Sequence, residues 1–245
     1  MAARRMFRRY LSTVTRTLAL TALLLLAACR EATPAAAPDR PKPELFLLTP
    51  LPLVWSERFG LDQSGSPVLK VLEKEYRVTP VDLPSRLPAG GLLLAVQPRA
   101  LSAEELVALD TWVRRGGRLV LLADPMLEWP SEIPLGDPRR APIAFPDTGL
   151  LLHWGLRLDA PEERGPKQSS LGGKTVLTAS PGALVRMDGT CAIGDQELMA
   201  RCRIGKGRAT IVADADFLDL GPRGLDGPTD HNLPALLSQL AALTR

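Results

Sequence analysis

The chain has 245 residues, of which 45% are hydrophobic and only 4% aromatic, so it is long enough to bury a sizeable core. Its formal net charge of +3 is misleading, because five of the 30 basic residues and no acidic one fall within the first 28 positions. The remainder carries 25 basic residues against 27 acidic ones. This balance excludes the charge excess of a nucleic-acid-binding protein.

Residues 1–28 have the layout of a secretory signal peptide. Met1 to Arg9 is cationic, and Leu18 to Ala28 is apolar and ends in small residues. As a helix the apolar stretch would span roughly 17 Å, well short of a bilayer core of about 30 Å. We therefore expect export and cleavage. An uncleaved membrane anchor over residues 10–28 is the alternative.

The tetrapeptide Leu-Ala-Ala-Cys that ends at Cys29 resembles the lipobox of bacterial lipoproteins. The resemblance implies cleavage before Cys29, a lipid on its sulfur and a periplasm-facing domain anchored to a membrane. By family analogy Arg30, where an aspartate would signal retention in the inner membrane, favours the outer membrane. The alternative is a plain signal peptide with Cys29 incidental. Residues 29–43 are rich in Pro and Ala and predict a semi-extended linker of roughly 40 Å.

Residues 44–245 predict a single α/β domain. The clearest helix, residues 103–115, has Ser102 as its N-cap, with Glu105 completing a capping box, and Gly116-Gly117 as its stop. Buried strands flank it on short joints, which is a βαβ unit with parallel pairing. Further strands are expected at 45–49, 76–82 and 210–213, and further helices at 68–75, 148–154 and 231–244.

The region from 174 to 214 has a β-rich pattern, and it contains Cys191 and Cys202. If Asp195 and Leu198 flank a two-residue turn, the hairpin register sets Cys191 directly opposite Cys202, within disulfide range. An exported compartment favours oxidation, and a lipid on Cys29 would account for the odd cysteine. Two reduced cysteines in a β-meander are the alternative.

Two stretches carry a family resemblance. The first runs from Gln97-Pro98-Arg99 through the 103–115 helix and Gly116-Gly117 to a buried strand ending in Asp124-Pro125. The second runs from Gly205 to Leu218. Together they resemble the GldG-type domain of ABC-transport auxiliary proteins, over roughly residues 45–125 and 203–243.

The resemblance implies a flavodoxin-like fold of the class I glutamine amidotransferase type, with a mostly parallel sheet and helices on both faces. Residues 126–202 would then be a β-rich hairpin insertion. Amidotransferases need a nucleophilic cysteine at a strand-to-helix elbow. Here that strand end reads Ala123-Asp124-Pro125, so the resemblance implies the fold without that chemistry.

Three aspartates follow the ends of predicted parallel strands: Asp124, Asp214 and Asp216. Ligands bind at this edge in open α/β folds, and such carboxylates can hold a divalent cation or act as acid and base. The competing interpretation is that they cap the next helix or turn.

Trp55 and Glu57, in the long loop after the first strand, and Gln97, at a strand end, complete the candidate residues of the ligand edge. A tryptophan tucked over the core is the alternative for Trp55. Gly172-Gly173-Lys174-Thr175 lacks the first glycine of a P-loop, and the two histidines have no zinc-ligand spacing. No metal or cofactor site is predicted.

These observations favour a non-enzymatic, lipid-anchored envelope domain that binds a protein or small ligand, as an accessory of an ABC-type transport system. Its partners would be the membrane and a transporter or other envelope protein, and no nucleic acid. The alternative function is a carboxylate- or metal-dependent hydrolase that uses the strand-end aspartates.

Overall fold

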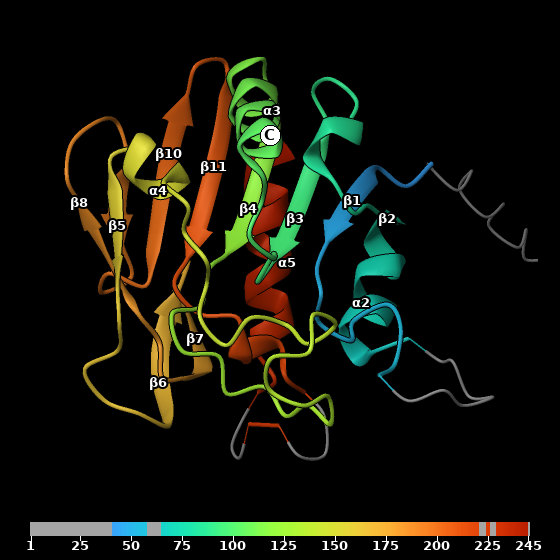
Figure 1. The fold of residues 1–245 in the computed structure, drawn as a ribbon, viewed down its shortest axis with the longest axis vertical. Coiled ribbons are helices and arrows are strands. Elements are labelled where there is room, and N and C mark those ends of the chain that lie inside the picture. The colour runs from blue at the N-terminus through green and yellow to red at the C-terminus, as the bar shows by residue number, and fades with distance from the viewer. Residues whose placement is uncertain (1–40, 58–64, 221–223, 226–228, 245) are drawn as a thin grey trace, which may run out of the picture. The chain divides into compact units, whose positions relative to one another are not determined.

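The computed structural model of the chain describes residues 41–57, 65–220, 224–225 and 229–244 (Figure 1). The predicted signal peptide and Cys29 lie outside the described residues. In the described part, no helix combines the length and apolar character needed to cross a bilayer.

A seven-stranded sheet forms the centre of the domain, in the order β2-β1-β3-β4-β11-β10-β9. Five neighbouring strands are parallel, and β10 and β9 continue the sheet in antiparallel pairing. The strands are β1 (Glu44–Leu48), β2 (Arg77–Pro80), β3 (Leu92–Val96), β4 (Arg118–Leu122), β9 (Ala192–Gly194), β10 (Met199–Ile204) and β11 (Gly207–Val212). The predicted α/β class with a mostly parallel sheet is confirmed.

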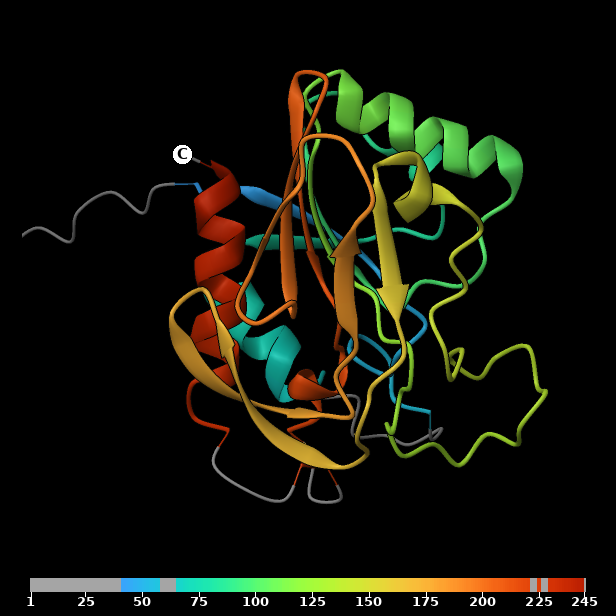
Figure 2. The same ribbon diagram turned by 90° about the vertical axis from the view of Figure 1, so that its left-hand side faces the viewer.

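Two long helices cover opposite faces of this sheet (Figure 2). On one face α5 (Asn232–Thr244) packs on β3, β4 and β11 and contacts α2 (Pro67–Glu75). On the other face lies α3 (Ala103–Arg114), which buries Leu109, Trp112 and Val113. Central strands sandwiched in this way must be apolar on both faces, and β3 is buried along its whole length.

The βαβ unit β3-α3-β4 has the predicted parallel pairing, with Leu92 opposite Arg118 and Val96 opposite Leu122. The predicted capping box forms only in part. Ser102 accepts from the Glu105 N–H at 3.3 Å, but the Glu105 carboxylate binds the backbone N–H and hydroxyl of Ser85 at 2.9 and 2.7 Å. Glu105 therefore ties α3 to the short helix η1 (Pro84–Arg86), which stands between β2 and β3.

The chain between β4 and β9 forms a long coil, the short helix α4 (Leu150–His153) and two small sheets. The antiparallel pairs are β5 (Leu156–Asp159) with β8 (Ala183–Arg186), and β6 (Pro166–Leu171) with β7 (Lys174–Ala179). The β6 strand lies before the segment predicted to be β-rich. It was not predicted, because its mostly polar sequence shows no apolar alternation. Gly172 and Gly173 make the β6–β7 turn with φ of 62° and 78°, which explains the glycine pair without a phosphate.

The hairpin of β9 and β10 has the predicted register, and a disulfide joins Cys191 to Cys202. Its turn places three consecutive non-glycine residues, Asp195, Gln196 and Glu197, at positive φ. Such backbone is costly, and it persists only where the surroundings fix it. The Asp195 carboxylate supplies part of that support, since it accepts from the Gly172 N–H at 2.6 Å.

We predict that reducing the Cys191–Cys202 bond lowers the free energy of unfolding by about 2–3 kcal/mol, because the unfolded chain regains the entropy of a short loop. Urea unfolding with and without reductant measures the change. The Cys191→Ala/Cys202→Ala variant should be insensitive to reductant, whereas Cys29→Ala should respond as the parent does. A parent protein of equal stability in both conditions would contradict the prediction.

Candidate functional site

The carboxyl edge of the parallel sheet brings the three predicted aspartates together. Asp124 follows β4, and Asp214 and Asp216 follow the neighbouring strand β11. One carboxylate oxygen of Asp124 accepts from the backbone N–H groups of Ala215 and Asp216, at 2.8 and 3.4 Å. The predicted convergence of these side chains therefore exists.

The aspartates are nevertheless enclosed and bound to the backbone. Their exposed fractions are 0% for Asp124, 0% for Asp214 and 2% for Asp216. Asp214 accepts from the N–H groups of Phe217 and Ala179 at 2.8 and 3.2 Å. Their geometry is that of the alternative weighed from the sequence, in which carboxylates cap the backbone that follows a strand.

Burial raises the pKa of all three carboxyl groups. Desolvation is the main cause for Asp124, whose pKa rises to about 6. Desolvation followed by repulsion from Asp124 raises the pKa of Asp216 to about 8. The same two causes, with Asp216 as a further repelling charge, raise the pKa of fully buried Asp214 well above its ordinary value. The cluster therefore holds protons near neutral pH.

Asp216 differs from the other two in having a buried oxygen, Oδ1, without a hydrogen-bond partner. Its second oxygen accepts from the Glu128 N–H at 2.7 Å, and the Glu128 carboxylate accepts from the Ser180 hydroxyl at 2.6 Å. Protonation of Asp216 neutralises this buried carboxylate, whose charge would be costly away from water. Within the described ranges, no group of three or more Asp, Glu, His or Cys side chains is arranged to hold a metal ion.

Gln97, a predicted ligand-edge residue, is fully buried and has a φ of 45°. Its amide accepts from the Asp124 N–H at 2.9 Å and donates to the carbonyls of Asp124 and Pro142, both at 3.0 Å. It therefore clamps the end of β4 to the coil of residues 126–147, which we call the excursion.

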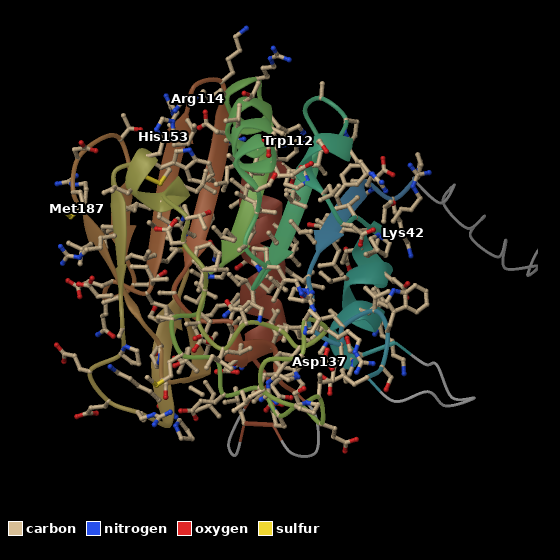
Figure 3. The ribbon with its side chains drawn as sticks, viewed as in Figure 1. Lys42, Trp112, Arg114, Asp137, His153 and Met187 are labelled. Atoms are coloured by element: carbon tan, nitrogen blue, oxygen red, sulfur yellow. A yellow bond between two sulfur atoms is a disulfide. The ribbon has the colours of Figure 1, made fainter. Side chains whose placement is uncertain are left out.

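Two other side chains fasten the excursion over the carboxyl edge. Glu57 accepts from the Ser131 hydroxyl at 2.8 Å and from the Glu132 N–H at 3.0 Å. Arg99 donates to the Pro138 carbonyl at 3.0 Å and to the Arg139 carbonyl. Figure 3 shows Asp137 on this part of the chain. Among the predicted edge residues Trp55 is exposed, with 70% of its surface accessible, and Glu57 is partly buried.

A cleft of about 350 Å³ opens at the same edge, beside the aspartates rather than around them. Its walls are the segments that follow β1, β2 and β3, together with the first turn of α3. The chain leaves β1 for β2 on one side and returns to β3 on the other, so the strand order reverses here. Open α/β sheets bind ligands at such a switch point.

The polar groups of the cleft are few. Asp82 and Arg99 are exposed, and Ser102 and Glu105 lie at the start of α3. The apolar wall includes Leu48, Leu83 and Leu101. The described lining contains no histidine or cysteine. Sequence reasoning missed this cleft, although Pro98-Arg99 after a buried strand was a usable signal.

We predict that the protein becomes less stable as pH rises, because the pKa of Asp216 increases from 3.8 to about 8 on folding. Between these values the folded state binds more protons than the unfolded state, so the free energy of unfolding falls with increasing pH. Asp216→Asn removes this charge and keeps an acceptor for the Glu128 N–H. The variant should flatten the profile by on the order of 2 kcal/mol between about pH 5 and pH 8.5.

Urea unfolding across this pH range tests the expectation, with Asp137→Asn as the matched control. Hydrogen bonds from Arg139 lower the pKa of Asp137 to about 2, so its charge does not change in the range measured. Parallel profiles for the parent and Asp216→Asn would contradict the assignment.

Solved structures similar to this chain are distant in sequence. An exo-β-1,4-mannosidase from Opitutaceae bacterium strain TAV5 is 15% identical, with a TM-score of 0.49, and the match covers 82% of this chain and 36% of that one. The β-galactosidase from Rahnella sp. R3 is 13% identical, with a TM-score of 0.47, over 83% and 31%. The chain thus spans about a third of the length of these glycosidases.

A cytoplasmic protein of Salmonella typhimurium LT2 is 13% identical, with a TM-score of 0.50, and is covered over 98% of its length by 81% of this chain. At this identity the likeness concerns the fold alone. No curated protein matches the sequence.

A family model described as ABC-type uncharacterized transport system matches residues 42–162. The matched segment runs from the start of β1 past β5, and it includes the Gly116-Gly117 pair and Asp124-Pro125 on which the resemblance was based. The family indicates an accessory of a transport system. Residues 42–162 thus match the ABC-transport auxiliary family that the sequence resemblance predicts.

Proposed function

We propose that this protein is a lipid-anchored, non-enzymatic binding component of an ABC-type transport system, and that the cleft at the β1–β3 switch point holds a segment of a partner protein. The observation that carries the proposal is that the carboxyl edge has two parts with different exposure. The cleft is open, whereas the carboxylates suited to chemistry are buried beside it and bound to backbone N–H groups.

The surroundings of the cleft suit a protein partner. Leu83 is 37% exposed at its wall, and Trp55, in the loop that follows β1, is 70% exposed. Exposed aromatic and aliphatic groups beside a few polar ones are typical of interface centres. Arg99 adds a cation whose backbone partners hold it in place.

The finer fold assignment belongs to the same proposal. The parallel strands follow the order β2-β1-β3-β4-β11, which corresponds to the 2-1-3-4-5 order of flavodoxin-like sheets when they are counted along the chain. Helices on both faces also support it. The crossover from β2 to β3 departs from the regular pattern, because it contains only the short helix η1.

Filling the cleft should abolish partner binding without unfolding the domain. Ala100 is exposed within the lining, so Ala100→Trp would occupy much of the space. Val107→Trp, on the 66% exposed face of α3 outside the lining, is the matched control. We expect in-cell crosslinking followed by affinity purification to recover transport-system proteins with the parent and Val107→Trp, and not with Ala100→Trp. Equal recovery from all three would refute the cleft as the binding site.

Anchoring through Cys29 is tested separately. We expect the mature chain to begin at Cys29 and to carry a lipid mass, and Cys29→Ala to move from the membrane to the soluble fraction of the envelope. Intact mass spectrometry and fractionation measure both. Arg30 favours recovery with the outer membrane. An unmodified thiol, or retention of residues 1–28, would overturn the anchor while leaving the cleft proposal standing.

A further inference from the structure

Basic side chains gather at the amino edge of the sheet, where β4 and β11 begin. The two short segments 114–118 and 201–208 contain seven Arg and Lys residues and no Asp or Glu. We call this set the basic corner: Arg114, Arg115, Arg118, Arg201, Arg203, Lys206 and Arg208.

The backbone itself brings the two segments together. The Lys206 N–H donates to the Arg114 carbonyl at 2.9 Å, and the Arg208 N–H donates to the Gly117 carbonyl at 3.2 Å. A side chain at Gly207 would collide with the Gly117 carbonyl, so glycine permits this approach. The basic corner is therefore built by the turn between β10 and β11 docking on the joint between α3 and β4.

The register of β10 and β11 concentrates charge on one face of the corner. Arg203 lies directly opposite Arg208, and Arg201 lies opposite Thr210. Like charges directly opposite each other destabilise a strand pair. These side chains line a hollow of about 490 Å³ beside the end of α5.

Several side chains of the basic corner have polar partners, among them Arg208, which donates to the Leu243 carbonyl at 3.0 Å. Arg201 donates to the neutral Gln239 amide at 3.0 Å, and Arg114 pairs with Asp110 at 2.7 Å. Within the ranges that the structure describes, the side chains of Arg115, Arg203 and Lys206 form no ion pair or hydrogen bond. All three are exposed.

The domain is joined to the preceding chain at the same edge. Pro43 accepts from the Arg77 N–H at 2.9 Å, and β1 then starts at Glu44 and runs parallel to β4 and β11. Figure 3 shows Lys42 near the start of β1 and Arg114 near the end of α3, both toward the edge where the parallel strands begin. Residue 42, just before β1, therefore lies toward the amino edge of the sheet, and the buried carboxylates lie at the opposite edge.

We propose that the basic corner docks on the phosphate headgroups of an anionic phospholipid surface. Guanidinium groups match phosphate geometry and bind it in a bidentate manner. Because the chain after residue 28 is slightly acidic overall, this local cluster and not the net charge would drive contact. The inference rests on the proposed anchor at Cys29 in one respect: a tether makes weak contact intramolecular, and so raises its effective concentration.

Vesicle binding by the full chain tests the proposal. The corner variant Arg115→Gln/Arg203→Gln/Lys206→Gln removes three exposed cations without described partners. The control variant Arg86→Gln/Lys167→Gln/Lys174→Gln removes three exposed cations elsewhere. On vesicles with about 30% phosphatidylglycerol, we expect the corner variant to partition roughly ten- to a hundred-fold more weakly than the parent and the control to match the parent. Raising salt from about 0.05 to 0.5 M should erase the difference.

All three proteins share residues 1–41, so any contribution of that segment cancels in the comparison. The result therefore distinguishes failure of the corner from failure of the Cys29 anchor. Equal partitioning of the corner and control variants would overturn the proposal, as would an equal loss on purely zwitterionic vesicles. Corner-dependent binding to soluble polyglutamate in place of the vesicles would also overturn it, in favour of an acidic protein partner.

Discussion

The carboxyl edge of the sheet depends on one demand, which is that buried backbone groups at the ends of central strands find hydrogen-bond partners. Two long-range contacts meet it. Gln97 pairs with both backbone groups of Asp124, and the Asp124 side chain in turn binds the N–H groups of Ala215 and Asp216. The ends of β3, β4 and β11 are thereby fixed in sequence across the sheet, and an unpaired group here would cost about 1–3 kcal/mol.

This solution determines what the edge can do. Carboxylates that cap buried N–H groups are desolvated, so the pKa values of all three aspartates rise. The excursion, held by Gln97, Glu57 and Arg99, lies over the same edge. The cleft beyond the ends of β1 and β3 stays open and has room for a ligand. The proposed binding role therefore falls to that cleft and not to the carboxylates.

Local patterns in the sequence predicted much of the scaffold. The 3.6-residue periodicity and cap of the 103–115 helix, flanked by apolar runs, were enough for β3-α3-β4 and its parallel pairing. The register around Cys191 and Cys202 followed from a turn position, although the turn adopts positive φ at Gln196 and Glu197, which have no preference for it. The aspartates were expected at one edge because parallel strands end together.

Burial of those side chains was not predictable in the same way. An aspartate after a strand has the same local pattern whether it faces a cleft or caps a neighbouring turn. The choice depends on a loop more than 80 residues away, as in the contacts of Asp124 with residues 215 and 216. Gln97 shows the same limit, because neither its positive φ nor its bond to Pro142 is encoded nearby.

The amino edge of β4 and β11 meets a related packing constraint. At the carboxyl edge, acidic side chains satisfy N–H groups left by strands that have ended. At the amino edge, the first residues of β4 and β11 are Arg118 and Gly207-Arg208, and the turn before β11 must approach α3 closely enough to require glycine. Long cationic side chains suit this close approach. Their aliphatic stems can pack on neighbouring residues while their charged heads remain in water. The basic corner thus leaves Arg115, Arg203 and Lys206 exposed, whereas the aspartates that follow β4 and β11 at the carboxyl edge are buried.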